Sequence, residues 1–235
     1  DLLIARPVAH QHVAPHLMET MPDQEMRDVI LNEAAKLAGD VLAPLNHQAD
    51  KAGGAKHFED GSVQTPEGFA AAYQQLSEGG WTSMEASEAY GGQALSLALS
   101  SCVNEMWQAS NMAFSLCHLL TQGLISALQH SASEDQKSLF LPPMIEGRWT
   151  GTMNLTEPQA GAGLGAIRRE GVKRGDHYLI SGQKIYITYG EHDMAENIVH
   201  LVLARTPDAP AGHKGISVFI VPKFLVNDDS SLRAQ

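Results

Sequence analysis

The spacing of apolar residues changes at about Gly147, and this change constrains the fold of the 235-residue chain more than any other feature. Before it, apolar residues recur every three or four positions, which is typical of amphipathic or buried helices. After it, they fall in short runs separated by turn-forming residues, which is typical of strands. Helices followed by strands indicate separate domains. We therefore predict a multidomain α+β protein, with an all-α helical bundle over 1–147 and a β-barrel-like domain over 148–235 that is too short to close.

The first helices can be placed from their start and stop signals. A helix is expected to begin at Pro22-Asp23 and to end at Pro44, because proline lacks the backbone donor that continues a helix. A loop should follow over 51–65. The next helix begins after Thr65, and Gly79-Gly80 should end it.

The remaining boundaries follow from caps, prolines and turn residues. The long apolar stretch from Leu95 to His130 predicts two buried helices that are split near Ser110-Asn111. Ser133 with Gln136 forms a capping-box pattern for the last helix, which should end or kink at Pro142-Pro143. Five strands are expected in the second domain, over residues 150–155, 166–172, 177–187, 198–204 and 216–221.

Composition excludes several classes of function. The formal net charge of −11 argues against nucleic acid as a partner, since a phosphate backbone requires clustered Lys and Arg. No stretch is long and apolar enough to span a membrane and Asp1–Pro7 has no signal-peptide pattern, so we expect a cytoplasmic protein. Cys102 and Cys117 are expected to be reduced core thiols. The eleven histidines show no ligand spacing, so no metal site is predicted.

Two segments of the second domain carry the pattern of a binding site. The first is Thr156-Glu157-Pro158-Gln159-Ala160-Gly161, a polar turn that closes an apolar run. The second, Ser181 to Thr188, is interpreted as a strand whose residues alternate between two faces. Together they could hold the edge of a planar heterocycle between backbone amides and hydroxyls. The Gly-rich turn at Gly161–Ala166 could bring amides close to an anion such as a pyrophosphate, although taken alone it would be better interpreted as a plain hairpin turn.

These segments occur with other motifs in a fixed order along the chain. The further motifs are Trp81 with Tyr90-Gly91-Gly92-Gln93, Glu134–Lys137 with Leu141–Met144, Gly147–Gly151 and Gly215–Pro222. The set resembles the acyl-CoA dehydrogenase family, and within it the long bacterial branch that includes the methylmercaptopropionyl-CoA dehydrogenases. The resemblance covers residues 25 to 224.

The resemblance implies an FAD-dependent enzyme that removes an α-proton and a β-hydride from an acyl-CoA thioester. It implies that Thr156 bonds the pyrimidine edge of the flavin, that Tyr186 lies against the ring and that Thr188 lies near N5. It also implies an electron-transfer flavoprotein as acceptor and a homodimer or homotetramer. The cofactor-binding residues it implies are Met153, Leu155, Thr156, Gly161, Ala162, Tyr186, Ile187 and Thr188.

The acyl-CoA chain is implied to contact the long helices and the turn, at Ser115, Leu116, Leu119 and Ala162. For the three helical residues, ordinary bundle core is an equally open interpretation.

Several residues depart from the family pattern. Ala162-Gly163 stands where Ser-Asp is usual, which removes one hydroxyl donor toward the pyrophosphate or CoA. Tyr186 replaces the common Trp, and Tyr189 stands where Asn is common. No segment matches the C-terminal helical domain that carries the catalytic carboxylate in this family, and Glu157 belongs to the turn motif. We therefore expect the chain to be part of a longer protein, with no catalytic residue of its own and no dehydrogenase activity alone.

Two alternatives remain open. An acyl-CoA oxidase would have the same fold but would let oxygen reach the reduced flavin. A non-catalytic flavin- or CoA-binding scaffold would bind the same groups without any reduction, and the missing hydroxyl and missing base both favour this reading.

Overall fold

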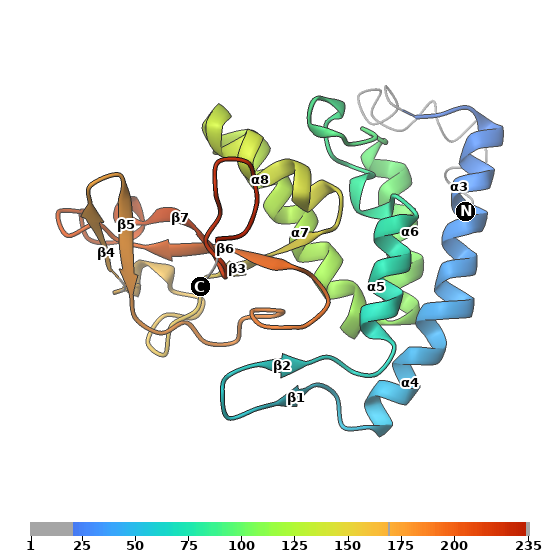
Figure 1. Ribbon diagram of the computed structural model, residues 1–235, viewed down its shortest axis with the longest axis horizontal. Coiled ribbons are helices and arrows are strands. Elements are labelled where there is room, and N and C mark those ends of the chain that lie inside the picture. The colour runs from blue at the N-terminus through green and yellow to red at the C-terminus, as the bar shows by residue number, and fades with distance from the viewer. Residues whose placement is uncertain (1–20, 169, 234–235) are drawn as a thin grey trace.

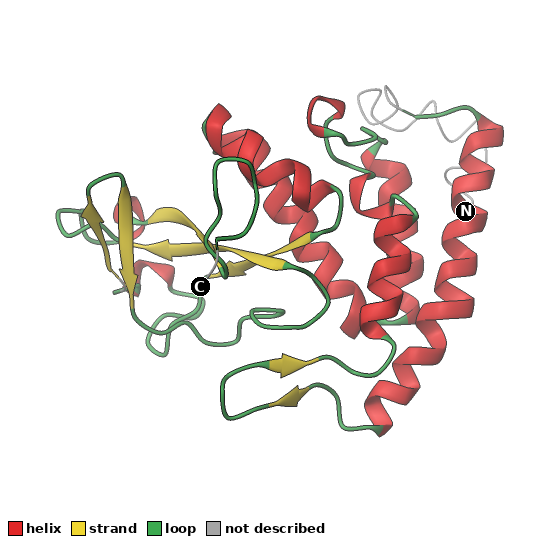
Figure 2. Ribbon diagram, viewed as in Figure 1, coloured by secondary structure: helices red, strands yellow, loops and turns green. Residues whose placement is uncertain are grey.

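A computed structural model describes residues 21–168 and 170–233 (Figure 1). The N-terminal segment Asp1–Pro7, which was examined for a signal peptide, lies outside the described residues. The described part divides into helices over the first half and strands over the second, as Figure 2 shows. The helices are α3 (Gln24–Lys36), α4 (Ala43–Lys51), α5 (Phe69–Glu78), α6 (Leu97–Ser110), α7 (Met112–Ser131) and α8 (Glu134–Ile145).

The first helix does not end at Pro44, so this prediction was wrong. Asp23 caps α3 with its side chain, and the helical path then continues through a π-helical turn, Leu37–Leu42, into α4. Pro44 falls at the start of α4. A wider π turn just before the proline lets the chain change its hydrogen-bond register where the ring would otherwise clash and a donor is missing.

The helix break near Ser110-Asn111 is confirmed. Asn111 has φ −154° and caps α7, accepting a hydrogen bond from the Phe114 N–H while its amide donates to the Leu42 carbonyl. The buried side chains of α5, α6 and α7 pack around Trp107, whose indole N–H donates to the Ala34 carbonyl of α3. One polar cap therefore both starts α7 and fixes it against the π-helical turn between α3 and α4.

The capping box at Ser133 is confirmed, but α8 continues through both prolines to Ile145. Pro143 cannot donate to the Leu139 carbonyl, and the Ser230 hydroxyl donates to that carbonyl instead, at 3.0 Å. A distant loop thus satisfies the acceptor that the proline leaves unpaired, so the helix persists for one more turn.

The segment expected as a loop over 51–65 contains a small hairpin. Its strands are β1 (Lys56–His57) and β2 (Val63–Gln64), paired antiparallel. Strands of two residues are too short for any periodic pattern, which is why the sequence indicated only a loop.

The second domain contains β3 (Trp149–Asn154), β4 (Glu170–Arg174), β5 (His177–Ser181), β6 (Asn197–Ala204) and β7 (Ser217–Pro222). β3, β6 and β7 form one sheet in that order, with β3 parallel and β7 antiparallel to β6, while β4 and β5 form a separate hairpin. The described strands do not close into a barrel, and β3 and β7 are both edges.

The strand predicted over 177–187 ends at Ser181. Gly182 has φ +133° and ends the extended run, so the second signature segment lies outside the sheet. Helix α7 packs under β3, where Gly151 allows close approach: a Cβ there would lie 2.9 Å from the Leu124 Cβ. The long buried helix is therefore in direct contact with the strand that leads into the first signature segment (Figure 1).

Candidate functional site

The two signature segments lie side by side in the structure. We call residues 153–162 the turn segment and residues 182–190 the crossing segment. The Ile185 N–H donates to the Thr156 carbonyl at 2.9 Å, and the Lys184 ammonium donates to the Leu155 carbonyl at 3.1 Å. Two stretches separated by the β4–β5 hairpin are thus joined through their backbones, as the sequence predicted for a shared site.

A buried ion pair reinforces this junction. The Lys184 Nζ lies 2.8 Å from Glu157 Oε1, and both side chains are almost fully removed from solvent. Glu157 Oε2 accepts further hydrogen bonds from the Arg168 N–H and the Gln159 amide. Burial by itself would raise the pKa of Glu157, but the hydrogen bonds from Lys184, Arg168 and Gln159 outweigh it and lower the pKa. The carboxylate is therefore charged and fully engaged in holding the turn.

The crossing segment is an irregular chain rather than an alternating strand. Tyr186 and Tyr189 have φ +59° and +52°, in the left-handed backbone region that residues other than glycine rarely adopt. Between them, the Thr188 carbonyl accepts a hydrogen bond from the Thr152 hydroxyl of β3 at 2.7 Å. Tyr186 is 88% exposed, so its ring has an open face. The left-handed residues turn the Ile187-Thr188 pair out of any ladder and toward β3.

Residues after Thr188 attach the crossing segment to the helical domain. The Tyr189 hydroxyl donates to the Ala113 carbonyl at 2.7 Å. Asp193 accepts two hydrogen bonds from Thr65, at 3.0 Å from the N–H and 2.6 Å from the hydroxyl. These contacts join the crossing segment to α7 and the chain that follows it to the end of the β1–β2 hairpin.

His192 is an uncharged side chain that lies between β3 and the residues after the crossing segment. Its Nδ1 accepts from the Met194 N–H at 3.1 Å, which leaves Nε2 as the donor to the Thr150 hydroxyl at 2.8 Å. Burial lowers the pKa of His192 to about 4. The imidazole therefore stays uncharged near neutral pH and serves as a hydrogen-bond bridge between β3 and the chain that follows the crossing segment.

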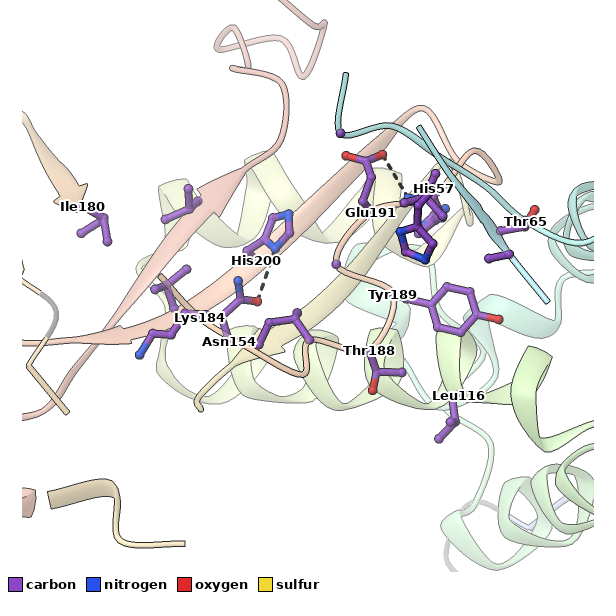
Figure 3. Close-up of a pocket in the computed structure, with 18 of the residues that line it drawn as sticks. His57, Thr65, Leu116, Asn154, Ile180, Lys184, Thr188, Tyr189, Glu191 and His200 are labelled. Atoms are coloured by element: carbon purple, nitrogen blue, oxygen red, sulfur yellow. Dashed lines mark hydrogen bonds between the residues drawn. The ribbon is translucent and has the colours of Figure 1, made fainter. Parts of the chain in front are cut away.

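A pocket of about 830 Å³ lies beside the crossing segment (Figure 3). Helix α7, the β1–β2 hairpin and the sheet contribute to its walls, through Leu116, His57 and His200 among others. Its lining is mostly apolar, with Asn154 and His200 joined by a hydrogen bond of 3.3 Å. The pocket is large enough for a drug-sized or cofactor-sized planar group.

The structure brings some of the expected site residues together and separates others. Ile187, Thr188 and Leu116 line the pocket. Met153 and Leu155 are half-buried against apolar clusters. Thr156 and Tyr186 lie where the two segments meet, outside the pocket lining, whereas Gly161 and Ala162 are exposed on the turn.

The helical residues expected at the acyl chain differ among themselves. Ser115 is buried, and its hydroxyl has no hydrogen-bond partner within the described residues. Leu119, one turn further along α7, is 41% exposed. His118 is buried beside Trp107, neither of its ring nitrogens has a hydrogen-bond partner in the part of the chain that the structure describes, and burial lowers its pKa to about 4.

The available donors suit a planar, hydrogen-bonding ring. Across residues 21–168 and 170–233, neither the Thr156 hydroxyl nor the Thr188 hydroxyl has a partner in the chain. The backbone at Gly161 and Gly163 is open, with no atom within 4 Å of an added Cβ. The Arg205 guanidinium donates to four carbonyls, among them those of Gly165 and Ile167, and so fixes the loop that follows the turn segment. The donor set therefore fits the group that the sequence predicted.

Sequence reasoning missed several residues of this arrangement. Arg205, His192 and Asp193 act through contacts with residues distant in the sequence, which no local pattern reveals. Lys184 was part of the recognised motif, but its pairing with Glu157 was not foreseen. No group of metal-ligating side chains occurs in the described ranges, and no helix there is long and apolar enough to cross a bilayer.

Comparison with known proteins gives matches over nearly the whole chain. The family model for the acyl-CoA dehydrogenase N-terminal domain matches residues 21–148, and that for the middle domain matches residues 152–233. A 3-methylmercaptopropionyl-CoA dehydrogenase of Ruegeria pomeroyi is 43% identical over 97% of the chain, and a butyryl-CoA dehydrogenase of Syntrophomonas wolfei is 41% identical over 87%. The chain spans only 39% and 34% of the length of these two relatives.

Solved structures agree with the sequence matches. An acyl-CoA dehydrogenase from Geobacillus kaustophilus has a TM-score of 0.68 and 25% identity, covering 85% of this chain and 48% of its own. A structure described as the electron transferring flavoprotein of Acidaminococcus fermentans has a TM-score of 0.69 and 28% identity, covering 86% and 49%.

Proposed function

The chain belongs to the acyl-CoA dehydrogenase family, and from this premise we propose that its protein oxidises an acyl-CoA thioester at the α,β carbons with FAD as the hydride acceptor. One observation supports the proposal most strongly. The turn and crossing segments are joined by the Ile185–Thr156 hydrogen bond, and each segment carries a threonine, Thr156 or Thr188, whose hydroxyl has no partner among the described residues. A flavin ring has hydrogen-bonding groups that such hydroxyls can bond.

In the proposed site each segment has a distinct task. Thr156 would bond the pyrimidine edge, Thr188 would lie near N5, and the exposed face of Tyr186 would lie against the ring. The remaining contacts would come from Met153, Leu155, Gly161, Ala162 and Ile187. FAD, when bound, accepts the hydride, and the donors at its edge stabilise the negative charge of the reduced ring.

The turn would bind the pyrophosphate or the CoA arm through its backbone. Ala162 lacks the usual hydroxyl, which costs about 1–2 kcal/mol of binding if nothing replaces it. The exposed amides around Gly161 and Gly163 supply donors that need no side chain. Ser115, Leu116 and Leu119 would contact the acyl chain, with Leu116 already at the pocket wall.

The catalytic base is not assigned to any carboxylate of the described residues. Glu191 is the acidic residue that lines the pocket there, and it is paired with Lys223. Glu157 is paired with Lys184, and Asp193 accepts from Thr65. We therefore expect the 235-residue polypeptide alone to leave acyl-CoA unreacted, with the base supplied elsewhere in the protein.

The ultraviolet–visible spectrum of the protein at its native length tests this function. We expect a bound-flavin spectrum that bleaches when an acyl-CoA is added anaerobically. A flavin spectrum that several acyl-CoAs fail to bleach would favour the non-catalytic scaffold. Peroxide formation in air at the rate of turnover would instead identify an acyl-CoA oxidase. Absence of any bound flavin would contradict the dehydrogenase and the oxidase and would leave only a scaffold that binds CoA.

The proposal extends to the architecture and partners of the protein. We place the domain boundary between residues 147 and 148 and regard 148–235 as part of a barrel-like domain, which the unpaired edges of β3 and β7 support. An intact mass above 25.3 kDa for the protein in its source cell would show that the chain continues.

We also propose a cytoplasmic homodimer or homotetramer that passes electrons to an electron-transfer flavoprotein. Co-purification and light scattering test these points.

A further inference from the structure

Tyr189 connects the crossing segment to the helical domain through a single hydroxyl. It follows Thr188 directly, and its hydroxyl donates to the Ala113 carbonyl in the first turn of α7 at 2.7 Å. Its ring packs against the apolar cluster of the helical domain and meets His192 edge to face, with centroids 5.6 Å apart. The contact therefore joins a loop of one domain to a helix of the other.

The backbone of Tyr189 is held in a conformation that an aromatic residue does not adopt freely. Its φ of +52° lies in the left-handed region, and such conformations persist where surrounding contacts determine them. Burial raises the pKa of the Tyr189 phenol, so the hydroxyl remains a donor at all physiological pH values. The hydroxyl contact is thus not lost through ionisation of the phenol.

Helix α7 and the crossing segment face one another at the pocket. Leu116 of α7 lines it together with Thr188 and Tyr189 (Figure 3). On the other side of Thr188, the Ile185 N–H is fixed to Thr156. Thr188 therefore lies between two anchors, one on the turn segment and one on α7.

We infer that Tyr189 is a positioning residue: its hydroxyl fixes the crossing segment to α7 and so sets the place of Thr188 relative to the helix that lines the pocket. The consequence for the flavin rests on the proposed function, whereas the anchoring itself does not. Loss of the hydroxyl should loosen the crossing segment without unfolding either domain, because the ring and its packing remain.

Tyr189→Phe tests the anchor by removing one oxygen atom. The reporter is amide hydrogen exchange at Gly190, whose N–H donates to Ile187, and at Ile185. We expect exchange at these two amides to become about five- to tenfold faster, the factor that corresponds to one lost neutral hydrogen bond. Tyr178→Phe is the matched control, since Tyr178 is half-exposed in β5 and its hydroxyl has no partner among the described residues.

A second variant separates the hydroxyl from the backbone conformation. Tyr189→Asn places at this position a residue that tolerates the left-handed region but cannot reach Ala113. Because it loses the ring packing as well as the hydroxyl, we expect it to exchange at least as fast as Tyr189→Phe. Exchange at the wild-type rate in either variant would overturn the inference, because the segment would then be held without the hydroxyl.

The affinity for FAD and the midpoint potential of the flavin distinguish a positioning role of Tyr189 from a purely structural one. In the FAD-loaded protein at its native length, Tyr189→Phe should weaken FAD binding several-fold and shift the midpoint potential of the flavin, while Tyr178→Phe changes neither. Faster exchange with unchanged affinity and potential would overturn the positioning role. If the wild type binds no FAD but Tyr189→Phe still speeds exchange, the anchor is upheld and the proposed function fails.

Discussion

Lys184 is the side chain that most directly links the two segments, because its ammonium contacts both Glu157 and the Leu155 carbonyl. Lys184→Met keeps the aliphatic stem but leaves the Glu157 carboxylate buried without its cation. Breaking a buried pair in this way costs about 3–5 kcal/mol. We expect a loss of this size in the free energy of unfolding, measured by urea denaturation, together with weaker FAD binding.

Lys36→Met provides the comparison. Lys36 pairs with Glu33, but the two side chains are 65% and 52% exposed, and pairs this exposed add little to stability because water screens them. Equal losses from the two substitutions would show that the buried Glu157–Lys184 pair stabilises the protein no more than an exposed pair does. A loss confined to Lys184→Met would locate the stabilisation in the signature segments.

Two buried histidines make stability depend on pH. Burial lowers the pKa of His118 and of His192 to about 4, against 6.5 in an unfolded chain. Between pH 6.5 and 4 the unfolded state binds protons that the folded state does not, so the free energy of unfolding falls as pH falls. Each histidine contributes up to about 1.4 kcal/mol per pH unit. Urea denaturation at pH 7, 6 and 5 measures this slope.

His118→Leu isolates one of the two contributions. Neither nitrogen of His118 has a partner within the described residues, so an apolar replacement loses no hydrogen bond. We expect the variant to fold and its stability to fall less steeply with pH, by about 1.4 kcal/mol per unit. A slope equal to that of the wild type would mean that His118 titrates normally in the folded protein.

At the scale of elements, the packing of β3 on α7 depends on Gly151. A Cβ at this position would lie 2.9 Å from both the Leu124 Cβ and the Met144 Cε. Gly151→Ala should push the strand away from the helices and displace the turn segment that follows it. We expect a loss of about 1–3 kcal/mol in thermal or urea unfolding, the usual cost of overpacking.

Gly123→Ala is the matched substitution on the other side of that contact. Gly123 is an exposed position inside α7 with nothing within 4 Å of an added Cβ. Alanine favours helix, so this variant should gain about 0.5–1 kcal/mol. Opposite signs for the two Gly→Ala changes would confirm the close approach at Gly151, and a neutral Gly151→Ala would contradict it.

Helices and their caps could be predicted from the sequence because their signals are local. Asn111 and Ser133 both cap helices where the pattern indicated. The helix ends predicted at the prolines were wrong. Pro44 follows a π turn, and the Leu139 carbonyl, which Pro143 cannot bond, accepts a hydrogen bond from Ser230 instead. A local sequence pattern does not reveal a donor that lies 91 positions away in the chain.

For the site, too, one part could be predicted from the sequence and another could not. The neighbouring placement of the turn and crossing segments was predicted, and it is confirmed by the Ile185–Thr156 hydrogen bond. The conformation of the crossing segment was predicted wrongly as a strand, because the left-handed tyrosines at 186 and 189 are set by tertiary contacts. Alternating polar and apolar residues resemble a strand whether or not a neighbouring strand is present to pair with them.

For the whole molecule, a contact between Thr65 and Asp193 joins the end of the β1–β2 hairpin to the second domain. Asp193→Ala removes the acceptor for both the Thr65 N–H and its hydroxyl. We expect the β1–β2 hairpin to detach from the second domain more often, which limited proteolysis within residues 55–64 would report as faster cleavage. Both domains should keep their helix and strand content by circular dichroism.

Asp229→Ala controls for the loss of a similar carboxylate. Asp229 also accepts from an N–H and a hydroxyl, but both belong to Ser231 in its own loop. Cleavage in the hairpin should stay at the wild-type rate in this variant. If both variants were cleaved alike, the Thr65–Asp193 contact would not hold the hairpin against the second domain.

The parallel pairing of β3 with β6 has a consequence for the order in which the protein forms. Strand β3 can complete this pairing only after β6, which comes later in the chain, has been synthesised. The helices precede these strands and can fold on local contacts, whereas pairings between distant strands form slowly. The sheet beside the turn and crossing segments is therefore assembled after the helices on which it packs.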